Sequence, residues 1–245
     1  MSFPKLETPV LSCILPVSGK KVKYRPYTVK EDKILNLVMT EDDEAKQIED
    51  MLDVVAELIK ACTFNELSAD DLCVPDMEYL FIKIKAASSG SIRKKIYTCK
   101  MTDADGNECN AENIVELDLN KIKLTKSKPE KLVKLNDELT LSMKAPTFAS
   151  VRKSMQADDG SDTNSGLHMM AASVEMVLHG DEVYTDFTND EIIDNILINM
   201  TEEQSQAVKK YFDDLPELVF TKRFTCKACK SKHDLEVKHL ANFFG

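Results

Sequence analysis

Apolar and polar residues alternate in two short stretches of the chain, and turn-forming residues interrupt each of them. Between residues 10 and 29, an apolar run and an alternating segment flank the turn-forming residues 16–19. Residues 131–147 repeat this arrangement around Asn136 and Asp137. Alternation with a period of two indicates a strand with one buried face, and turn residues between two such runs indicate a hairpin. The pattern therefore predicts one β-hairpin near the start of each half of the chain.

Apolar residues recur every three or four positions after both predicted hairpins, which indicates helices with one buried face. In the first half, such stripes occupy residues 34–38, 48–59 and 77–84, and the last lies between Pro75 and Gly90, which favour a helix start and a helix end. In the second half, the stripe consists of Leu167, Met170, Val174 and Val177, and it follows a polar segment, 158–165, that is predicted to be a loop.

Two capping boxes mark further helices in the second half. A capping box pairs a Thr side chain with the main chain three residues later, and a Glu or Gln side chain with the Thr main chain. Thr188 with Glu191 and Thr201 with Gln204 have this spacing. We therefore expect helices to begin at both threonines.

Each half closes with a second predicted hairpin that carries two cysteines. The motif aromatic-Thr-Cys-Lys stands at residues 97–100 and again at 224–227. Because hairpin, helices and cysteine hairpin recur in one order, an internal duplication is the economical interpretation. The predicted fold class is α+β and internally duplicated, and each half is a β-hairpin, a group of α-helices and a zinc-ribbon-like cysteine hairpin. A stretch rich in Lys, Ser and Pro sets the boundary, giving a first repeat at 1–125 and a second at 126–245.

The cysteines of the two closing hairpins have the character of metal ligands. Zinc takes four ligands in a tetrahedron, and thiolates on tight turns supply them in pairs. Cys226 and Cys229 have the Cys-x-x-Cys spacing of a zinc knuckle. Cys99 and Cys109, with nine residues between them, meet only if the intervening loop bulges outward. We predict that the four thiols form one structural zinc site joining the two halves.

Alternative interpretations of these residues remain open at the level of sequence. The four thiols could be free on their turns, and His233 could replace one cysteine, although a surface position at a strand start is expected for it. Redox chemistry requires the first thiol at a helix N-terminus, whereas the residues after Cys229 return to a strand. The three remaining cysteines are expected to be small core side chains: Cys13, Cys62 and Cys73.

Composition narrows the functional classes. The chain has 245 residues, a net charge of −10 and a pI near 5.0, which points away from nonspecific nucleic-acid binding. It contains neither an apolar run of membrane length nor an N-terminal signal pattern, so no membrane partner is expected. An odd number of cysteines, seven, fits a reducing cytoplasm better than a disulfide framework.

Catalytic motifs are missing from the sequence. It has no phosphate-binding loop, dinucleotide fingerprint, nucleophile elbow or His-Glu-x-x-His motif. The paired carboxylates near predicted helix ends fit capping and solubility. We therefore expect a binding protein and not an enzyme.

Three segments resemble the baseplate hub assembly proteins of T4-like tailed phages: residues 3–9 (FPKLETP), 19–35 (GKKVKYRPYTVKEDKIL) and 74–81 (VPDMEYLF). The resemblance is clearest over the first half of the chain. It implies an assembly factor, or chaperone, that binds phage baseplate hub or tail proteins in the host cell cytoplasm during virion assembly. Two alternatives are a structural baseplate component retained in the virion and a zinc-ribbon nucleic-acid-binding protein. The sequence leaves the oligomeric state undetermined.

Overall fold

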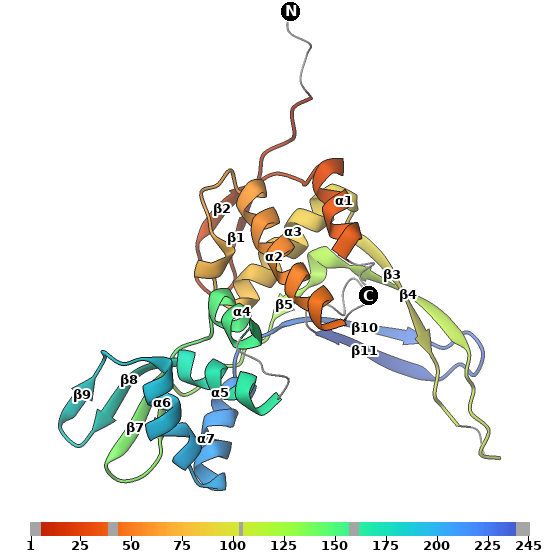
Figure 1. Cartoon of the computed structure of the whole chain (residues 1–245). Helices are drawn as coiled ribbons and strands as arrows, with labels where there is room; N and C mark the ends of the chain where they lie inside the picture. The colour runs from red at the N-terminus through yellow and green to blue at the C-terminus, as the bar shows by residue number, and fades with distance from the viewer. Residues whose placement is uncertain (1–5, 39–43, 103–104, 157–161, 239–245) are drawn as a thin grey trace, which may run out of the picture.

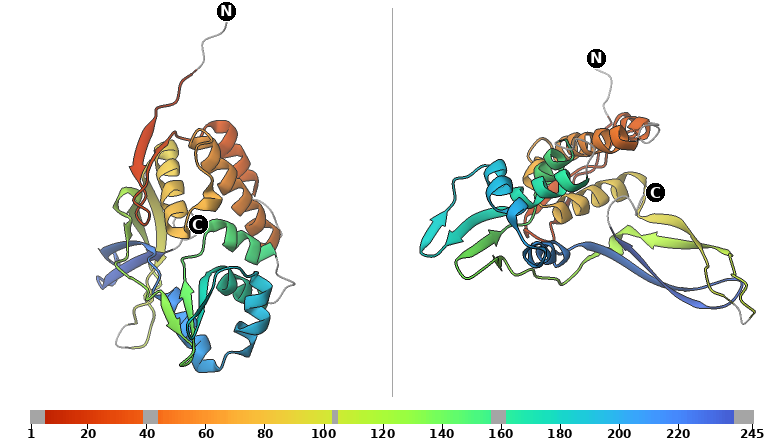
Figure 2. Two further views of the ribbon diagram at one scale, coloured as in Figure 1. Left: turned by 90° about the vertical axis from the view of Figure 1, so that its left-hand side faces the viewer. Right: turned by 60° about the horizontal axis from the view of Figure 1, so that its bottom comes forward.

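The computed structural model describes residues 6–38, 44–102, 105–156 and 162–238. They form an N-terminal lobe, a C-terminal lobe and a long arm (Figure 1). The arm and the C-terminal lobe extend in opposite directions from the helices of the N-terminal lobe (Figure 2). Within the described residues, no helix combines the length and the apolar composition that crossing a membrane would require.

The N-terminal lobe consists of a hairpin and three helices. Its elements are β1 (Leu11–Ile14), β2 (Lys21–Tyr24), α1 (Val29–Val38), α2 (Glu44–Cys62), the 3-10 turn η1 (Ala69–Asp71) and α3 (Val74–Ser89). The predicted hairpin and all three predicted helices of the first half are confirmed. Leu15, Ile59 and Leu80 are fully buried in the shared core. The buried carboxylate of Asp76 accepts hydrogen bonds from the main-chain N–H groups of the β1–β2 turn, which fixes the hairpin on α3.

An ion pair fixes the start of α1. The Arg25 guanidinium donates two hydrogen bonds to the Glu31 carboxylate, at 2.6 and 3.0 Å, and the Thr28 main-chain N–H donates a third at 2.6 Å. The hydrogen bond from Arg25 lowers the pKa of Glu31 to about 2; burial opposes this shift, and the bonds from Thr28 support it. Glu31 therefore stabilises the fold in its ionised form.

This depressed pKa predicts a pH dependence of stability. A carboxylate with a lowered folded-state pKa contributes stability above its unfolded pKa, here 4.5, and the contribution is lost as the pH falls toward about 2. The stability difference between the wild type and Glu31→Gln is therefore expected to be complete at pH 7 and to vanish near pH 2. Urea unfolding at a series of pH values measures it, with Glu66→Gln, at an exposed position of the same lobe, as the control. A difference that is independent of pH would contradict this role of Glu31.

The C-terminal lobe packs helices against a four-stranded antiparallel sheet, in the order β6-β7-β8-β9. Its elements are β6 (Leu132–Lys134), β7 (Leu139–Met143), α4 (Phe148–Gln156), α5 (Asp162–Ala172), β8 (Val174–His179), β9 (Glu182–Tyr184), α6 (Asn189–Asn195), the 3-10 turn η3 (Leu197–Asn199) and α7 (Glu202–Asp213). The hairpin predicted at 131–147 is β6–β7. Both predicted capping boxes are present, with hydrogen bonds in both directions at Thr188 and Thr201.

Two sequence predictions for this lobe are corrected. The helical stripe predicted through Val174 and Val177 is wrong at these residues, because α5 ends at Ala172 and both valines point into the core from β8. Their spacing of three positions fits a helix, but β-branched residues also suit a strand, and pairing with β7 decides the outcome. Part of the loop predicted at 158–165 lies outside the described residues, and residues 162–165 belong to α5.

Helix α4 joins the two lobes. Phe148, from the second half of the chain, is 1% exposed and lies in the core of the N-terminal lobe. Its main-chain N–H donates to Leu72 O at 2.9 Å. One turn later, Arg152 pairs with Asp70 at 3.0 Å and with Asp53 of α2. The second half is thus anchored in the first by both apolar and ionic contacts.

The arm is made of two long hairpins whose inner faces pack together. They are β3 (Ile92–Thr98) with β4 (Glu112–Asp118), and β10 (Leu218–Thr225) with β11 (Lys232–Lys238); β5 (Lys123–Leu124) adds a short strand to β10. Both hairpins confirm the strands predicted around the cysteine motifs. Side chains from both halves of the chain fill the arm core, including Leu117, Leu119, Leu218 and Val237. The arm base is therefore an apolar sandwich that contacts α3 through Ile82.

The order hairpin, helices, hairpin recurs in both halves, but the second half contains an additional hairpin, β8–β9. Two of the three apolar cores draw on both predicted ranges, 1–125 and 126–245, through Phe148 in one and the arm strands in the other. The α+β class is confirmed. The duplication and its boundary stay predictions.

Candidate metal centre

The two cysteine hairpins have the same main-chain geometry although their loops differ in length. The N–H of the residue after the second cysteine donates to the carbonyl of the first: Asn110 to Cys99 at 2.9 Å, and Lys230 to Cys226 at 3.1 Å. Both donors have positive φ values, 49° and 61°. Such left-handed residues turn the chain sharply. Each pair of thiols is therefore presented by an equivalent tight turn.

Contacts at its base close the longer loop of the first hairpin. Cys109 N donates to Met101 O at 2.8 Å, and Thr102 pairs with Glu108 in an isolated bridge. These contacts close the loop on itself, so Cys109 returns to the position that Cys229 occupies in the shorter turn. The predicted meeting of Cys99 and Cys109 is confirmed, and residues 103 and 104 of the predicted bulge lie outside the described residues.

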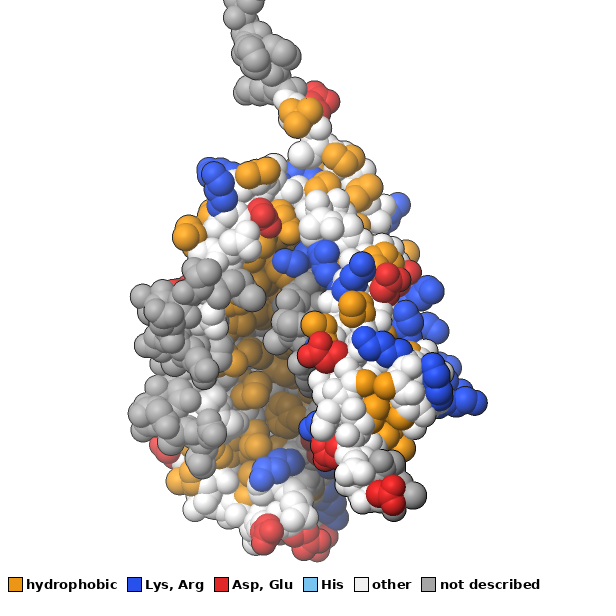
Figure 3. Space-filling model, turned by 90° about the vertical axis from the view of Figure 1, so that its right-hand side faces the viewer, with side chains coloured by type: hydrophobic (Ala, Val, Ile, Leu, Met, Phe, Trp, Pro, Cys, Tyr) orange, Lys and Arg blue, Asp and Glu red, His pale blue; other side chains and the backbone are white. Residues whose placement is uncertain are grey.

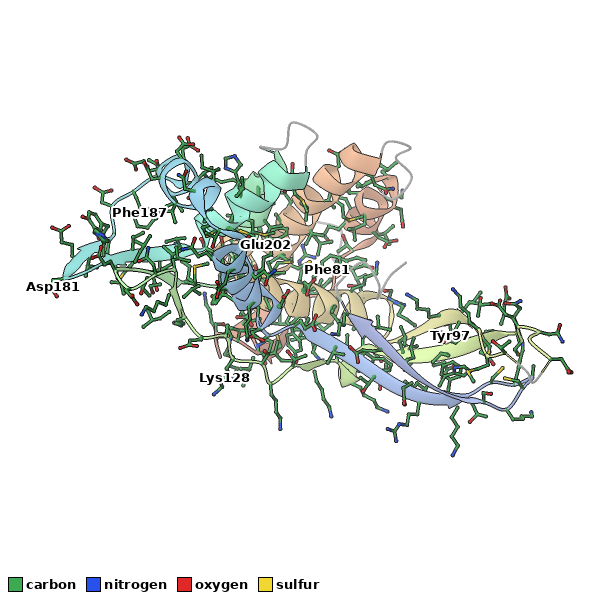
Figure 4. All side chains as sticks on the ribbon, turned by 90° about the horizontal axis from the view of Figure 1, so that it is seen from below. Phe81, Tyr97, Lys128, Asp181, Phe187 and Glu202 are labelled. Carbon is green, nitrogen blue, oxygen red and sulfur yellow. The ribbon has the colours of Figure 1, made fainter. Side chains whose placement is uncertain are left out.

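The four cysteine sulfur atoms lie together between the hairpins, in the outer part of the arm near Tyr97 (Figure 4). All four lie within 4.8 Å of one another. The sulfur–sulfur distances from Cys99 to Cys229 and from Cys109 to Cys226 are 3.7 and 3.9 Å. A tetrahedral zinc ion with bonds of about 2.3 Å separates its sulfur ligands by about 3.8 Å, whereas a disulfide brings them to about 2 Å. The spacing fits a four-thiolate metal ion and not a pair of disulfides.

The electrostatic environment favours thiolates at the second hairpin. Burial opposes the ionisation of Cys226, but the main-chain N–H groups of Ala228 and Cys229 and the Asn113 amide overcome it, and the pKa falls to about 6. Hydrogen bonds from Ser231 lower the pKa of Cys229. The Met101 N–H favours ionisation of Cys99, yet burial and the three neighbouring thiols raise its pKa to about 12. Four thiols in one place ionise together only if a cation balances their charge.

Asn113 connects the two hairpins beside the cluster. Its side chain is 5% exposed, and its amide nitrogen lies 3.5 Å from Cys226 Sγ and donates to Ala111 O at 2.9 Å. Its amide oxygen accepts a hydrogen bond from Lys227 N at 2.9 Å. An amide from β4 thus fixes the turn of the opposite hairpin. No sequence pattern marks this residue, because an Asn in an alternating strand carries no motif.

An aromatic group supports the cluster from the inner side of the arm. The rings of Tyr97 and Phe224, the aromatic residues of the two repeated motifs, meet edge to face at 5.1 Å. His233 stacks on Phe224 at 5.2 Å, and its Nε2 lies 3.2 Å from Cys99 Sγ. The surface position expected for His233 is wrong: the ring is half-buried between the hairpins, where it contacts a cysteine of the cluster. Its inward position follows from the alternation of β11, which also buries Leu235 and Val237.

The remaining cysteines lie away from the cluster. Cys62 is fully buried, and Cys13 and Cys73 are half-buried. Burial raises the pKa of Cys62 and Cys73 to about 11 and also raises that of Cys13. All three are therefore un-ionised at neutral pH, as the sequence interpretation of apolar side chains requires.

The fold and the cluster define an α+β protein whose projecting arm carries four cysteines between two hairpins. The chain belongs to the family described as T4 bacteriophage base plate protein, whose family model matches residues 8–245. The match covers the second half as well as the first, and therefore includes the arm and all four cysteines. No curated protein and no solved structure gives a significant match to the chain.

Proposed function

We propose that this protein is a non-catalytic assembly factor that binds baseplate hub or tail proteins in the host cell cytoplasm during virion morphogenesis. Its membership of the phage base plate family carries the proposal. The architecture supports it, because a long arm on a two-lobed body offers extended surfaces to other proteins (Figure 1). The resemblance of residues 19–35 and 74–81 to hub assembly proteins favours a chaperone over a permanent component.

The proposal is tested by locating the protein during infection. Quantitative mass spectrometry of infected-cell extract is expected to find it with hub or tail proteins after affinity purification of a tagged copy. The same measurement on purified virions is expected to find none. A fixed number of copies per mature baseplate would overturn the chaperone role and identify a structural component.

We also propose that the cysteine cluster holds a structural zinc ion through Cys99, Cys109, Cys226 and Cys229. The support is the sulfur spacing of 3.7 and 3.9 Å together with the two equivalent turns. Zinc favours four thiolates in closed structural sites. When bound, the ion would join β3–β4 to β10–β11 at the outer part of the arm. X-ray absorption at the zinc edge is expected to fit four sulfur neighbours at about 2.3 Å; an iron signal with no zinc would contradict the choice of metal.

A substitution at Asn113 tests the proposed zinc site without removing any of its four ligands. Asn113→Ala removes the amide that lies beside Cys226 and fixes the turn at Lys227. Loss of a supporting hydrogen bond of this kind lowers metal affinity by about 10- to 100-fold. Competition with a chromophoric zinc chelator measures the change. Asn120→Ala, a change of an exposed Asn in the turn that follows β4, is the matched control and is expected to leave the affinity unchanged.

A further inference from the structure

The strand β3 forms an open edge of the arm, since β4 is its only strand partner among the described residues. Leu119 N donates to Ser91 O at one end of this hairpin, and Cys99 N donates to Ala111 O at the other. Hydrogen-bonded and non-bonded positions alternate along an antiparallel pair. The residues between these ends that direct both N–H and C=O toward the open edge are therefore Ile92, Lys94, Ile96 and Thr98, and all four side chains are exposed.

The other edge of this hairpin faces the rest of the arm. Lys222 of β10 donates its ammonium group to Glu116 O at 2.8 Å, so one outward carbonyl of β4 already has a partner. Of the two edges, we therefore consider β3 the one that a new strand would join. With seven residues, β3 offers a long edge. Charged edge residues, Lys above all, keep such edges from pairing with like chains, whereas a chain of opposite charge pairs favourably.

The two outer faces of the arm differ in character. On the β3–β4 face, Ile96 and Ile114 lie directly opposite each other and are 62% and 68% exposed, and Ile92 is 49% exposed. On the β10–β11 face, every exposed strand residue is polar or charged: Thr221, Arg223, Thr225, Lys232, Asp234 and Glu236. The exposed apolar side chains of these four strands therefore all lie on the hairpin that has the open edge.

The charge along the edge selects the kind of partner. Residues 93–95 are Arg-Lys-Lys in a chain whose net charge is −10. Lys and Arg side chains also gather along the right-hand side of the molecule in Figure 3, which looks toward the arm. Like charges opposite each other destabilise a strand pair, and opposite charges stabilise it. A second copy of β3 would bring six cations together, so a second copy is disfavoured and an acidic strand is favoured.

We propose that the open edge of β3 binds an extended acidic segment of a partner protein as an added β-strand. Such strand addition derives affinity from main-chain hydrogen bonds and specificity from alternate side chains. The complementary segment has three successive acidic residues opposite positions 93–95 and a β-branched apolar residue on each side, opposite Ile92 and Ile96. This inference assigns the partner binding proposed above to the open edge of β3, and it therefore rests on the proposed function.

A synthetic peptide tests the proposal on the full-length protein. The probe is a fluorescein-labelled, acetylated and amidated peptide, Thr-Val-Asp-Glu-Asp-Val-Thr, whose binding is followed by fluorescence anisotropy. The same peptide with three lysines in place of its acidic residues is expected to bind at least about tenfold more weakly. Lys94→Glu is expected to weaken binding of the acidic probe by about tenfold, and Lys94→Gln by less. Lys23→Glu, the same charge change at an exposed position of β2, is the matched control and is expected to have no effect.

Methylation of the peptide main chain separates strand addition from simple charge attraction. Only every second peptide N–H faces β3 in an added strand. N-methylation of one alternate set of residues is therefore expected to abolish binding, and methylation of the other set to leave it unchanged. Equal binding of both methylated peptides, or equal binding to Lys94→Glu, would overturn the proposal. Self-association of the protein that competes with the peptide would do so as well, since the occupant would then be a second copy. Mass spectrometry of virions tests the assembly role separately, so either claim can fail without the other.

Discussion

Cys226→Ser is expected to abolish metal binding and to release the outer part of the arm while both lobes stay folded. Isolated two-stranded hairpins are marginally stable in water, and the buried apolar core of the arm extends outward as far as Val115 and Leu235. Farther out, the hairpins are joined by the aromatic group and the cysteine cluster. Structural zinc supplies about 10–16 kcal/mol in zinc-finger peptides, so losing it removes most of the stabilisation of this region.

Hydrogen exchange measures the effect strand by strand. Amides of the outer β3 and β10 residues are expected to exchange at least about 100-fold faster in Cys226→Ser than in the wild type, while those of α3 and β7 keep their protection. Cys13→Ser, which changes a half-buried cysteine outside the cluster, is the matched control. Unchanged protection in Cys226→Ser would show that the hairpins hold together without the cluster and would contradict its structural role.

Phe148→Ala is expected to lower the free energy of unfolding by about 3–5 kcal/mol, the usual cost of emptying a fully buried Phe site. Phe148 is 1% exposed in the core of the N-terminal lobe, although it belongs to the second half of the chain. The substitution therefore removes the apolar contact that fixes α4 on this lobe. We expect both lobes to lose stability, because the ion pairs of Arg152 with Asp53 and Asp70 lie on the same face of the helix.

Urea unfolding followed by circular dichroism measures this loss. Met155→Ala, in the same helix but at a position 43% exposed, is the matched control and is expected to cost less than about 1 kcal/mol. A loss of that small size in Phe148→Ala would mean that α4 does not depend on the N-terminal core. Destabilisation of the C-terminal lobe alone would show that Phe148 does not contribute to the N-terminal core.

The sequence predicted those features that local patterns determine. Period-two alternation located β1–β2, β6–β7 and both cysteine hairpins, and capping boxes located the starts of α6 and α7. The cysteine cluster was also accessible from sequence, because closely spaced cysteine pairs are typical ligands of structural zinc. The repeated aromatic-Thr-Cys-Lys motif corresponds to equivalent turns in three dimensions.

Features that depend on long-range contacts were not predictable in this way. Val177 has helical spacing from Leu167, yet it pairs with Leu141 of β7, a partner that only the folded sheet reveals. Phe148 belongs to a core formed mainly by residues more than 60 positions earlier, such as Leu80. Asn113 contacts Cys226 across the arm, at a sequence separation of 113 residues. No local pattern distinguishes such residues from their neighbours.

The rigidity of the arm connects the cysteine cluster with the proposed docking edge. A projecting element binds with little entropic cost only if it is rigid, and the cysteine cluster joins its two hairpins beyond Val115 and Leu235, the outermost buried residues of the arm core. The open edge of β3 ends at Thr98, next to Cys99. Metal binding would thus hold in place the strand that we propose as a docking edge.

Elemental analysis of the purified native protein, combined with thiol titration, is the direct test of the zinc site. We expect about one zinc ion per chain, with the four cluster thiols protected in the folded protein and reactive after chelation or unfolding. Protein purified without chelators that contains no metal, and whose four cluster thiols titrate freely while it is folded, would contradict it.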